Sequence, residues 1–545
     1  MYNKGIILEQ QDLNKRLLLA LALSFLVFVG YSYLFSTPKT AQPAEQTAKK
    51  HETPKVATAT PTTNAPAPTK EAKTNNAPVA SSSTSTLVTV VSDTFKMSID
   101  EFGRISQFEL LENKYQKDGK DLQILNPGEV KPLEIRFSDA KLNEEAFKTP
   151  YSYTGSSSID VTSAPKTITL TQKLSSVTLT KKITVQSNGA YSIDISTSSS
   201  VPYFITPGHR PMADSSRYLL VRGALVKGKD GAMTIIEDKK ANGDEVFKHA
   251  TIASAFDRYV ASTFYNFNKG MNVSIVKEKD DNPLVFVEGS QNLHLGGYIG
   301  PKEYKTLKSI NPELTDTIEF GFFTFLSRPF YKVLLWIENV VGNWGWAIVL
   351  FTLLVKLILF PLSYKGMMSM QKLKDLAPKM KELKEKHKGD PAKLNAQMME
   401  MYKKNGANPM GGCLPMILQI PVFFALYRVL LNADELQGAT WLSFWINDLS
   451  AADPYYILPV LMGLSMWFQQ RITPNNFTDP MQEKIFKWFP VGMALMFIIM
   501  PFPSGLVLYW VVNNTFTIGQ QYVINNAYAK HKAAAIAAHK KGKES

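Results

Sequence analysis

The sequence predicts a membrane α-helical bundle of six transmembrane helices joined to a large antiparallel β-sandwich domain. Six long apolar runs predict the helices, because about 20 consecutive apolar residues are needed to cross a bilayer. Between the first and second runs, short segments alternate apolar and polar residues, which is typical of half-buried β-strands. The 545 residues carry a net charge of +13. Because Lys and Arg collect on the cytoplasmic side of membrane proteins, the apolar runs explain this charge better than nucleic-acid binding does.

The N-terminal residues 1–35 are predicted to form a signal-anchor transmembrane helix, whose apolar run covers 17–35. A cleavable signal peptide is the alternative, but it would have a shorter apolar region followed by a small-residue cleavage site. Residues 36–86 contain no Leu, Ile or aromatic residue and are rich in Ala, Pro and Thr. Such a segment cannot bury a core, so we expect a flexible, disordered linker.

Residues 87–318 are predicted to form the β-sandwich domain. Cys413 is the only cysteine of the chain, so no intrachain disulfide can stabilise this domain. A domain of roughly 230 residues buries enough apolar surface to be stable without one. The alternation of apolar and polar residues is clearest at 167–171, 177–180, 183–185 and 191–195.

Residues 319–342 are predicted to form an amphipathic helix that lies in the plane of the membrane interface. Charged residues such as Arg328 and Glu338 fall outside the apolar stripe of this helix. A helix that packs against the β domain is the alternative interpretation. The apolar residues that recur at helical spacing are Phe323, Leu326, Phe330, Leu334, Ile337 and Val341.

Residues 343–525 contain five further apolar runs, and charge predicts the side of the membrane on which each loop lies. The segment 365–404 holds eleven Lys against five acidic residues, and the tail 526–545 holds five Lys against one Glu, so both are predicted to be cytoplasmic. The loop 432–454 holds four acidic residues and no Lys or Arg, which places it outside. A topology of six spans with both termini in the cytoplasm agrees with the predicted side of every loop. The five runs cover about 344–364, 413–431, 455–471, 485–500 and 503–523.

The cytoplasmic segment 365–410 is predicted to be a helical hairpin that turns at 389–391. Leu and Met residues recur at three- and four-residue spacing on both arms. Its lysines and those of the basic tail 526–545 could bind anionic lipid headgroups, ribosomal RNA or a partner protein. The alternative is that these lysines are solvated and serve only to orient the chain in the membrane.

Lys356 is the charged residue inside an otherwise uncharged span, 346–361. A cation in hydrocarbon costs roughly 2.5–3.5 kcal/mol, which a chain tolerates when the charge faces water, a partner or a substrate. The alternative is that Lys356 extends to the headgroups. If the helix ends near Lys365, that distance is about 13 Å, beyond the roughly 6 Å reach of a lysine. Thr352 lies one turn earlier on the same face.

Uncharged polar residues of other spans are predicted to surround this cation. Trp510, Asn513, Thr517 and Gln520 fall on one stripe of the last span, and Gln419 lies in the third span. Hydrogen bonds that merely hold helices together are the alternative, and each contributes only about 0.6 kcal/mol. Because the later spans contain no Asp, Glu or His, the predicted site attracts acidic or polar peptide and lacks the usual parts of a proton relay.

No known catalytic, metal or cofactor motif occurs in the chain. The HExxH, Walker and CxxC patterns are all absent, and none of the seven His lies in an apolar run. We therefore expect no catalytic residue, no metal site and no cofactor, and a function that is not enzymatic. A solute transporter or channel with an outer binding domain is the alternative function. It would require ionisable coupling residues or an inverted repeat at the membrane midplane.

Several motifs in the last five spans match those of a known family in order and spacing. The chain from about 300 to 528 resembles the YidC membrane-protein insertases of Gram-negative bacteria, relatives of the Oxa insertases. The leading anchor, linker and β domain match the architecture of the Gram-negative form. The motifs are Gly-Asn-Trp-Gly at 342–345, Asn-Pro-Met-Gly-Gly-Cys-Leu-Pro at 408–415, Asp-Pro-Tyr-Tyr-Ile-Leu-Pro at 453–459, Thr-Asp-Pro-Met at 478–481 and Pro-Ser-Gly-Leu-Val-Leu-Tyr at 503–509.

This resemblance implies an inner-membrane insertase and chaperone whose β domain is periplasmic. It implies that the last five spans form the insertase core and line a hydrophilic groove, closed towards the periplasm. Nascent membrane proteins would leave this groove for the bilayer, alone or beside the Sec translocon. The resemblance also assigns Thr352, Lys356, Tyr509 and Trp510 to the groove charge and substrate contacts. Two residues depart from the family pattern, which commonly has Arg at 356 and Tyr at 510.

Overall fold

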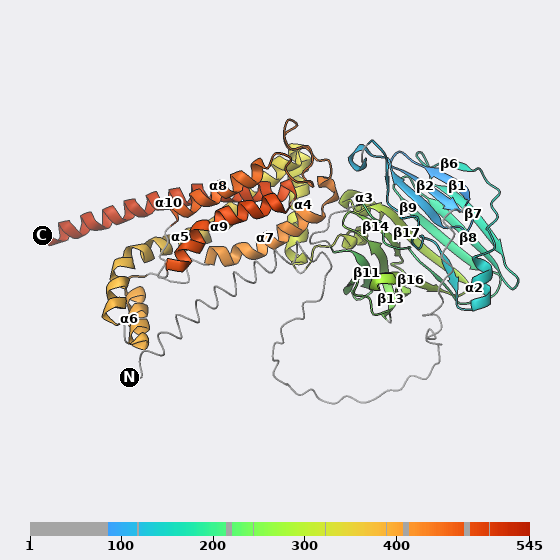
Figure 1. Ribbon diagram of the computed structural model, residues 1–545, viewed down its shortest axis with the longest axis horizontal. Coiled ribbons are helices and arrows are strands. Elements are labelled where there is room, and N and C mark those ends of the chain that lie inside the picture. The colour runs from blue at the N-terminus through green and yellow to red at the C-terminus, as the bar shows by residue number, and fades with distance from the viewer. Residues whose placement is uncertain are drawn as a thin grey trace, which may run out of the picture. The chain divides into compact units, whose positions relative to one another are not determined.

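The computed structural model describes residues 85–116, 119–213, 221–243, 245–321, 323–387, 390–406, 414–473, 480–500 and 502–544 (Figure 1). The chain forms two compact units that divide between Thr317 and Ile318. The first is built of β-strands and the second of helices. The predicted anchor at 1–35, almost all of the linker at 36–86, and Cys413 lie outside the described residues.

The first unit contains a five-stranded and a twelve-stranded sheet. The five-stranded sheet has the order β4-β3-β2-β1-β6 and consists of β1 (Thr86–Val91), β2 (Phe95–Asp100), β3 (Ile105–Leu110), β4 (Leu122–Gln123) and β6 (Ser158–Asp160). The prediction of an antiparallel β domain is confirmed, and among the described strands only β1 and β6 pair in parallel. Short helices connect the strands: η2 (Asn113–Tyr115), α2 (Ala140–Ala146), η3 (Lys279–Asp281), α3 (Tyr304–Ile310) and η4 (Pro312–Thr317).

The twelve-stranded sheet has the order β5-β10-β16-β15-β13-β14-β17-β9-β8-β7, and β11 pairs with both β13 and β12. Buried residues of both sheets, such as Phe95 and Ile183, belong to one hydrophobic core. The strands are β5 (Ile135–Phe137), β7 (Lys166–Lys173), β8 (Thr178–Val185), β9 (Ala190–Thr197), β10 (Tyr203–Ile205), β11 (Gly223–Gly228), β12 (Met233–Glu237), β13 (Val246–Phe256), β14 (Val260–Tyr265), β15 (Met271–Lys277), β16 (Pro283–Gly289) and β17 (Asn292–Pro301).

Lys181 occupies an inward position of β8, where the alternation would place an apolar residue. Its neighbours on that face, Leu179 and Ile183, are fully buried, and so is Lys181. Its Nζ donates hydrogen bonds to the main-chain oxygens of Gly103 at 2.9 Å and Leu133 at 2.7 Å. Burial in this core lowers the pKa of Lys181 to about 7.

We expect the stability of the β domain to rise with pH through Lys181. Between the folded pKa of about 7 and the ordinary value of 10.5, the unfolded chain binds a proton at Lys181 that the folded chain does not, so raising the pH favours the folded state. Lys181→Met has no such group. Between pH 7 and 9 its free energy of unfolding should therefore rise by about 2 kcal/mol less than that of the wild-type protein.

Hydrogen exchange of the β7–β9 peptides in the full-length protein measures this difference, when the variant and the wild type are compared at each pH. Lys182 follows Lys181 and lies on the outward face of β8. Lys182→Met is therefore the matched control and should retain the wild-type pH dependence. If the stability of the wild type and that of Lys181→Met change equally with pH, the lowered pKa of Lys181 is not the cause of the pH dependence.

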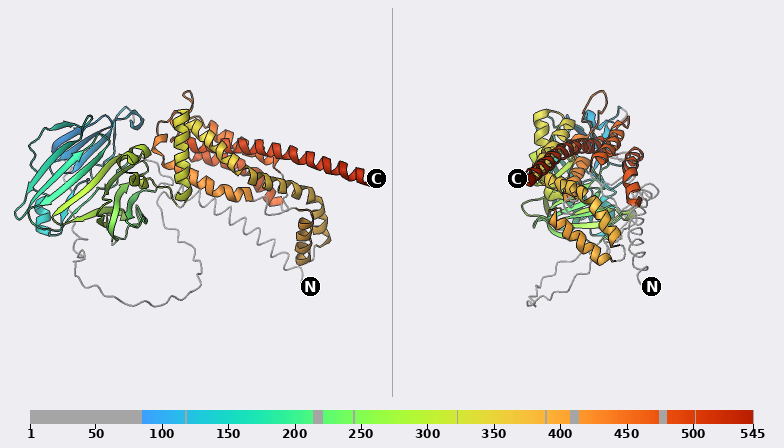
Figure 2. Two further views of the ribbon diagram at one scale, coloured as in Figure 1. Left: turned by 180° about the vertical axis from the view of Figure 1, so that it is seen from behind. Right: turned by 90° about the vertical axis from the view of Figure 1, so that its left-hand side faces the viewer.

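The second unit is helical: α5, α7, α8, α9 and α10 run roughly along one another, and α4 lies across one end of them (Figure 1, Figure 2). Helix α10 packs against α5 and α8, α8 packs against α9, and α4 packs against α5 and α7. Among the described residues, α5 is the one helix long and apolar enough to cross a membrane by length and composition. The elements are α4 (Thr324–Val341), α5 (Trp344–Lys386), α6 (Pro391–Lys404), α7 (Leu414–Asn432), η6 (Asp434–Leu436), α8 (Ile457–Ile472), α9 (Pro480–Ile499) and α10 (Ser504–Glu544).

The assumption that the helix of Lys356 ends near Lys365 is wrong, because α5 continues without a break to Lys386. Pro361 and Pro378 lie inside α5, and an internal proline kinks a helix without necessarily ending it. The first arm of the hairpin is therefore the continuation of α5, and α10 likewise runs on through the basic tail. The estimate of about 13 Å from Lys356 to the headgroups assumed a helix end near Lys365 and therefore no longer applies. The environment of Lys356 must be judged from its contacts.

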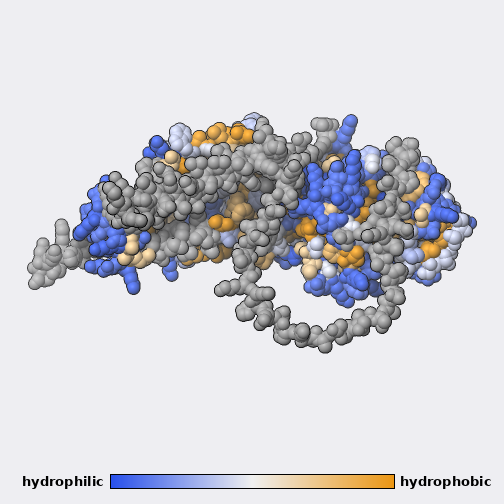
Figure 3. Space-filling view, turned by 60° about the horizontal axis from the view of Figure 1, so that its bottom comes forward, coloured by the Kyte–Doolittle hydropathy of each residue, from blue (hydrophilic) through white to orange (hydrophobic). Residues whose placement is uncertain are grey.

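The two arms of the hairpin, the C-terminal part of α5 and α6, pack through a small apolar cluster. Leu373 and Leu376 of α5 are buried with Tyr402 of α6. The Tyr402 hydroxyl donates a hydrogen bond to the sulfur of Met380 at 3.3 Å. On the face drawn in Figure 3, hydrophilic residues gather at the end of the helical unit where α6 lies, and patches of hydrophobic residues are visible further along it.

Helix α4 has apolar residues on two faces. It buries Tyr331 and Leu334, and Ser327 Oγ donates a hydrogen bond to the main-chain oxygen of Ala425 in α7 at 3.1 Å. On its other side, Phe325 is 73% exposed and Trp336 is 64% exposed. Water would disfavour so much exposed aromatic surface. This second apolar face was not recognised in the sequence.

Candidate functional site

Lys356 of α5 and two residues of α10 meet inside the helical unit. Lys356 Nζ donates a hydrogen bond to Thr517 Oγ1 at 2.8 Å. Gln520 Nε2 donates one to the main-chain oxygen of Lys356 at 3.4 Å. These contacts join α5 to α10, and Lys356 is half-buried between them.

The charge of Lys356 has no acidic partner. Among the described residues, no carboxylate lies within ion-pair distance of its ammonium group. Thr517 Oγ1 donates its own proton to the main-chain oxygen of Asn513 at 2.7 Å, so only an oxygen lone pair faces Lys356. An ammonium group has three donors, and a buried donor without a partner costs free energy. The position therefore attracts water or polar groups of a ligand, with acidic groups favoured by charge.

Gln419 of α7 extends this polar network. Its Nε2 donates hydrogen bonds to the Tyr509 hydroxyl at 3.0 Å and to Asn513 Oδ1 at 3.3 Å. Because Asn513 also accepts from Thr517 through its main-chain oxygen, the contacts run without a break from Lys356 to Tyr509. Three helices thus contribute one connected set of uncharged polar groups and one cation.

Trp510 lies in an aromatic cluster beside this network. Its ring stacks on Phe423 of α7 with centroids 5.0 Å apart and meets the edge of Phe497 of α9 at 4.8 Å. Phe423 also stacks near Tyr509, at 6.4 Å. Offset and edge-to-face aromatic pairs contribute about 0.5–1.5 kcal/mol each beyond the area that they bury. Trp510 is therefore held in a defined orientation, with part of its surface still exposed.

Of the eight residues predicted for the site, six lie in the hydrogen-bonded network, whereas Thr352 and Trp510 do not. Thr352 is buried, and its hydroxyl donates to the main-chain oxygen of Ile348 at 2.7 Å, within its own helix. It shares a face with Lys356 but does not contact the network. Lys356, Thr517 and Gln520 form one end of the network, Gln419, Asn513 and Tyr509 form the other, and Trp510 packs beside it.

Sequence reasoning missed the two phenylalanines that position Trp510. Phe423 lies four residues after Gln419, so the two share a face of α7, and this spacing could have pointed to it. Phe497 has no such signal, because its role depends on how α9 packs. A further contact, from Asn514 Nδ2 to Ser465 Oγ at 3.1 Å, joins α10 to α8.

The distal parts of α5 and α10 are joined by a second polar cluster, at the base of the hairpin. Asp375 accepts hydrogen bonds from the Tyr528 hydroxyl and Lys532 Nζ, both at 2.8 Å. Partial burial acts to raise the pKa of Asp375, but the bonds from Lys532 and Tyr528 outweigh it, so this pKa lies below its usual value. The basic C-terminal part of α10 is thus tied to the hairpin.

Comparisons with known proteins agree along the whole chain. The family model described as 60Kd inner membrane protein matches residues 336–532, and the model of the YidC periplasmic domain matches residues 247–333. A protein of Wolinella succinogenes named membrane protein insertase YidC is 47% identical over 534 residues, which cover 97% of this chain and 98% of that protein. Proteins of the same name from Campylobacter jejuni and Helicobacter pylori are 47% and 43% identical over 97% and 96% of this chain, and over 98% of each relative.

Solved structures of similar proteins include an active YidC insertase with its first transmembrane domain resolved. It is 17% identical, with a TM-score of 0.34, over 81% of this chain and 95% of that one. The crystal structure of YidC from Thermotoga maritima is 16% identical, with a TM-score of 0.27, over 80% of this chain and 99% of that one.

Proposed function

Because the chain belongs to the YidC family of membrane protein insertases, we propose that it inserts nascent membrane proteins through a hydrophilic, positively charged groove within its helical unit. The family is one of inner-membrane proteins with a periplasmic β-rich domain and a helical insertase part. The solute transporter or channel considered from the sequence is set aside, since the full-length relatives are insertases.

The observation that carries this proposal is the hydrogen-bonded network from Lys356 to Tyr509. It joins α5, α7 and α10 through polar side chains and leaves the Lys356 charge without an acidic partner among the described residues. If these polar residues served only to hold the helices together, we would expect the cation to be paired or absent, because an unpaired cation in hydrocarbon is costly. A groove that admits water and polar peptide explains why the cation is retained.

In the proposed mechanism, the groove shortens the hydrocarbon barrier that a polar segment must cross. The acidic or polar outer tail of a substrate enters and is solvated by Lys356, Gln419, Asn513 and water. Arg or Lys side chains in a low-dielectric site attract acidic groups strongly, so the cation lowers the cost of transit. The apolar helix of the substrate stays in lipid, and its burial drives insertion. No covalent step is needed.

The proposal extends to the arrangement in the membrane. Six spans, the anchor at 1–35 and five in the insertase core at 343–525, would place both termini in the cytoplasm and residues 87–318 in the periplasm. The exposed apolar face of α4, with Phe325 and Trp336, supports the placement of 319–342 in the membrane interface. Chaperone activity, work beside the Sec translocon, and ribosome or lipid contacts of 365–410 and 526–545 are parts of the same proposal.

A photocrosslinking probe at position 510 tests where the substrate passes. We expect it to crosslink to a ribosome-stalled nascent membrane protein in native membranes. The matched control is position 515, which is exposed on the same helix but, five residues further on, points about 140° away at 3.6 residues per turn. Substrate crosslinks should be at least several-fold stronger from 510. Equal crosslinking from both positions would contradict a groove on this face.

A further inference from the structure

Three loops of the β domain meet at one end of the twelve-stranded sheet. Strand β10 pairs antiparallel with β5 and with β16, and β16 pairs antiparallel with β15. The C-terminal ends of β10 and β15 and the N-terminal end of β5 therefore lie at the same end of the sheet. His209 follows β10, Glu278 follows β15, and Glu129 precedes β5. The topology thus brings together one imidazole and two carboxylates.

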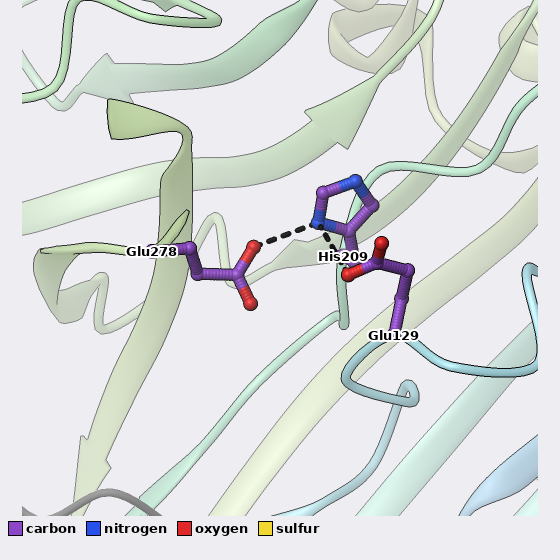
Figure 4. Close-up of side chains that lie close together, drawn as sticks. All are labelled: Glu129, His209 and Glu278. Carbon is purple, nitrogen blue, oxygen red and sulfur yellow. Dashed lines mark hydrogen bonds and ion pairs between the residues drawn. The ribbon is translucent and has the colours of Figure 1, made fainter. Parts of the chain in front are cut away.

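The three side chains point toward a common centre (Figure 4). His209 Nδ1 lies 2.7 Å from Glu278 Oε2 and 3.7 Å from Glu129 Oε2. One ligand atom from each residue lies within 4.8 Å of the other two. Ligands about 2.0–2.2 Å from a tetrahedral metal ion are roughly 3.3–3.5 Å apart. The two observed distances, 2.7 Å and 3.7 Å, lie on either side of this separation, so side-chain shifts of less than about 1 Å would bring both pairs to it.

The backbone around these residues is held independently of any ligand. The His209 main-chain N–H donates to the Val130 oxygen at 2.8 Å, and that of Glu278 donates to the Asn282 oxygen at 2.8 Å. Gly208 has φ +89°, and a Cβ there would lie 2.6 Å from the Pro132 nitrogen. A glycine is therefore what lets the His209 loop approach the Glu129 loop so closely.

Burial and access also suit a metal ion. The His209 side chain is 10% exposed, whereas that of Glu129 is 45% exposed. The imidazole is thus shielded from solvent, and the side of Glu129 leaves an entry path. A mixed nitrogen and carboxylate set favours zinc and similar transition metals, because Ca²⁺ and Mg²⁺ prefer oxygen ligands alone. Three protein ligands leave a fourth position for water.

We propose that Glu129, His209 and Glu278 form a binding site in the β domain for a divalent transition metal such as Zn²⁺. The ion would link the loops before β5, after β10 and after β15. This inference goes beyond the insertase function and does not depend on it. It also departs from the sequence-based expectation of no metal site.

Calorimetric titration of Zn²⁺ into the full-length protein, purified in detergent without a histidine tag, tests the proposal. We expect one Zn²⁺ site per chain. In His209→Ala its affinity should fall at least about tenfold or be lost, because removal even of a residue that only hydrogen-bonds to a metal ligand lowers metal affinity about 10–100-fold. Glu129→Gln should weaken binding in the same direction. Its side chain is 45% exposed, so this variant tests the site without threatening the fold.

The matched control is His294→Ala in the same domain. His294 Nδ1 lies 2.6 Å from Asp194 Oδ1, and both side chains are exposed, so among the described residues His294 has one carboxylate beside it and does not belong to a group of three metal ligands. It should leave the Zn²⁺ affinity unchanged. Absence of Zn²⁺ binding, or equal losses in His209→Ala and His294→Ala, would overturn the site. X-ray absorption of the zinc-loaded protein should show nitrogen and oxygen ligands, and a sulfur ligand would also overturn it.

Discussion

Lys356→Ala should reduce the insertion of a substrate with an acidic outer tail by roughly 10- to 100-fold, whereas Lys356→Arg should retain most of it. A hydrogen bond to a charged group contributes about 1.5–3 kcal/mol, and each 1.36 kcal/mol is a factor of ten. Arginine keeps the charge and offers five donors, so it can replace lysine beside Thr517. Insertion into proteoliposomes, scored by protease protection of the tail, measures the effect.

Two comparisons isolate the electrostatic contribution of Lys356. A substrate whose tail is neutral and short should lose far less insertion in Lys356→Ala, because it needs no cation. Lys530→Ala removes an exposed lysine from α10 and should insert both substrates as the wild type does. If the alanine and arginine variants at 356 insert the acidic substrate equally well, the electrostatic part of the mechanism is rejected.

Gln419→Leu should lower insertion of the same acidic substrate by about tenfold, which is more than the loss of folded protein accounts for. The substitution removes the donor to both the Tyr509 hydroxyl and Asn513 Oδ1, so the polar wall of the groove is broken between α7 and α10. A buried acceptor left without a donor costs about 1–3 kcal/mol. If Gln419 served only to join the helices, its loss would lower the stability by about 0.6 kcal/mol and the folded protein would still insert its substrate normally.

Paired measurements of insertion and thermal stability in the same detergent-purified protein distinguish these two roles of Gln419. The control is Ile420→Ala, which changes the next residue of α7, whose side chain is 47% exposed and directed away from the network. We expect wild-type insertion from this control. Full insertion by Gln419→Leu at unchanged stability would mean that the network is not the path of the substrate.

Local patterns predicted the elements well because their causes are local. The 3.6-residue period placed Asn513, Thr517 and Gln520 on one face of a helix, and the two-residue period indicated the strands of the β domain. The same local reasoning failed where a helix continues. Gly366, directly after Lys365, is the residue type that commonly follows a helix end, but it lies inside α5, and helical spacing continues on both sides of it.

Two lysines, Lys181 and Lys356, show a further limit of sequence patterns. The charge of Lys356 was conspicuous because its span is otherwise uncharged. Lys181 escaped notice because one lysine in an alternating strand ordinarily marks the outward face. Its inward position follows from the register of β8 against β7 and β9, and the oxygens that receive its hydrogen bonds come from residues 78 and 48 positions away.

The amino-acid sequence alone was sufficient for the antiparallel β domain, the helical part, the family and the polar stripe of α10, and it singled out Lys356, since all of these depend on composition, periodicity and short motifs. Tertiary structure alone decided which of those residues meet. Lys356 and Thr517 are 161 residues apart and Gln419 and Tyr509 are 90 apart, and His209 is 69 residues from Glu278. Such pairs are set by helix packing and strand order, because side chains so distant in sequence come within bonding distance only when the elements between them have folded.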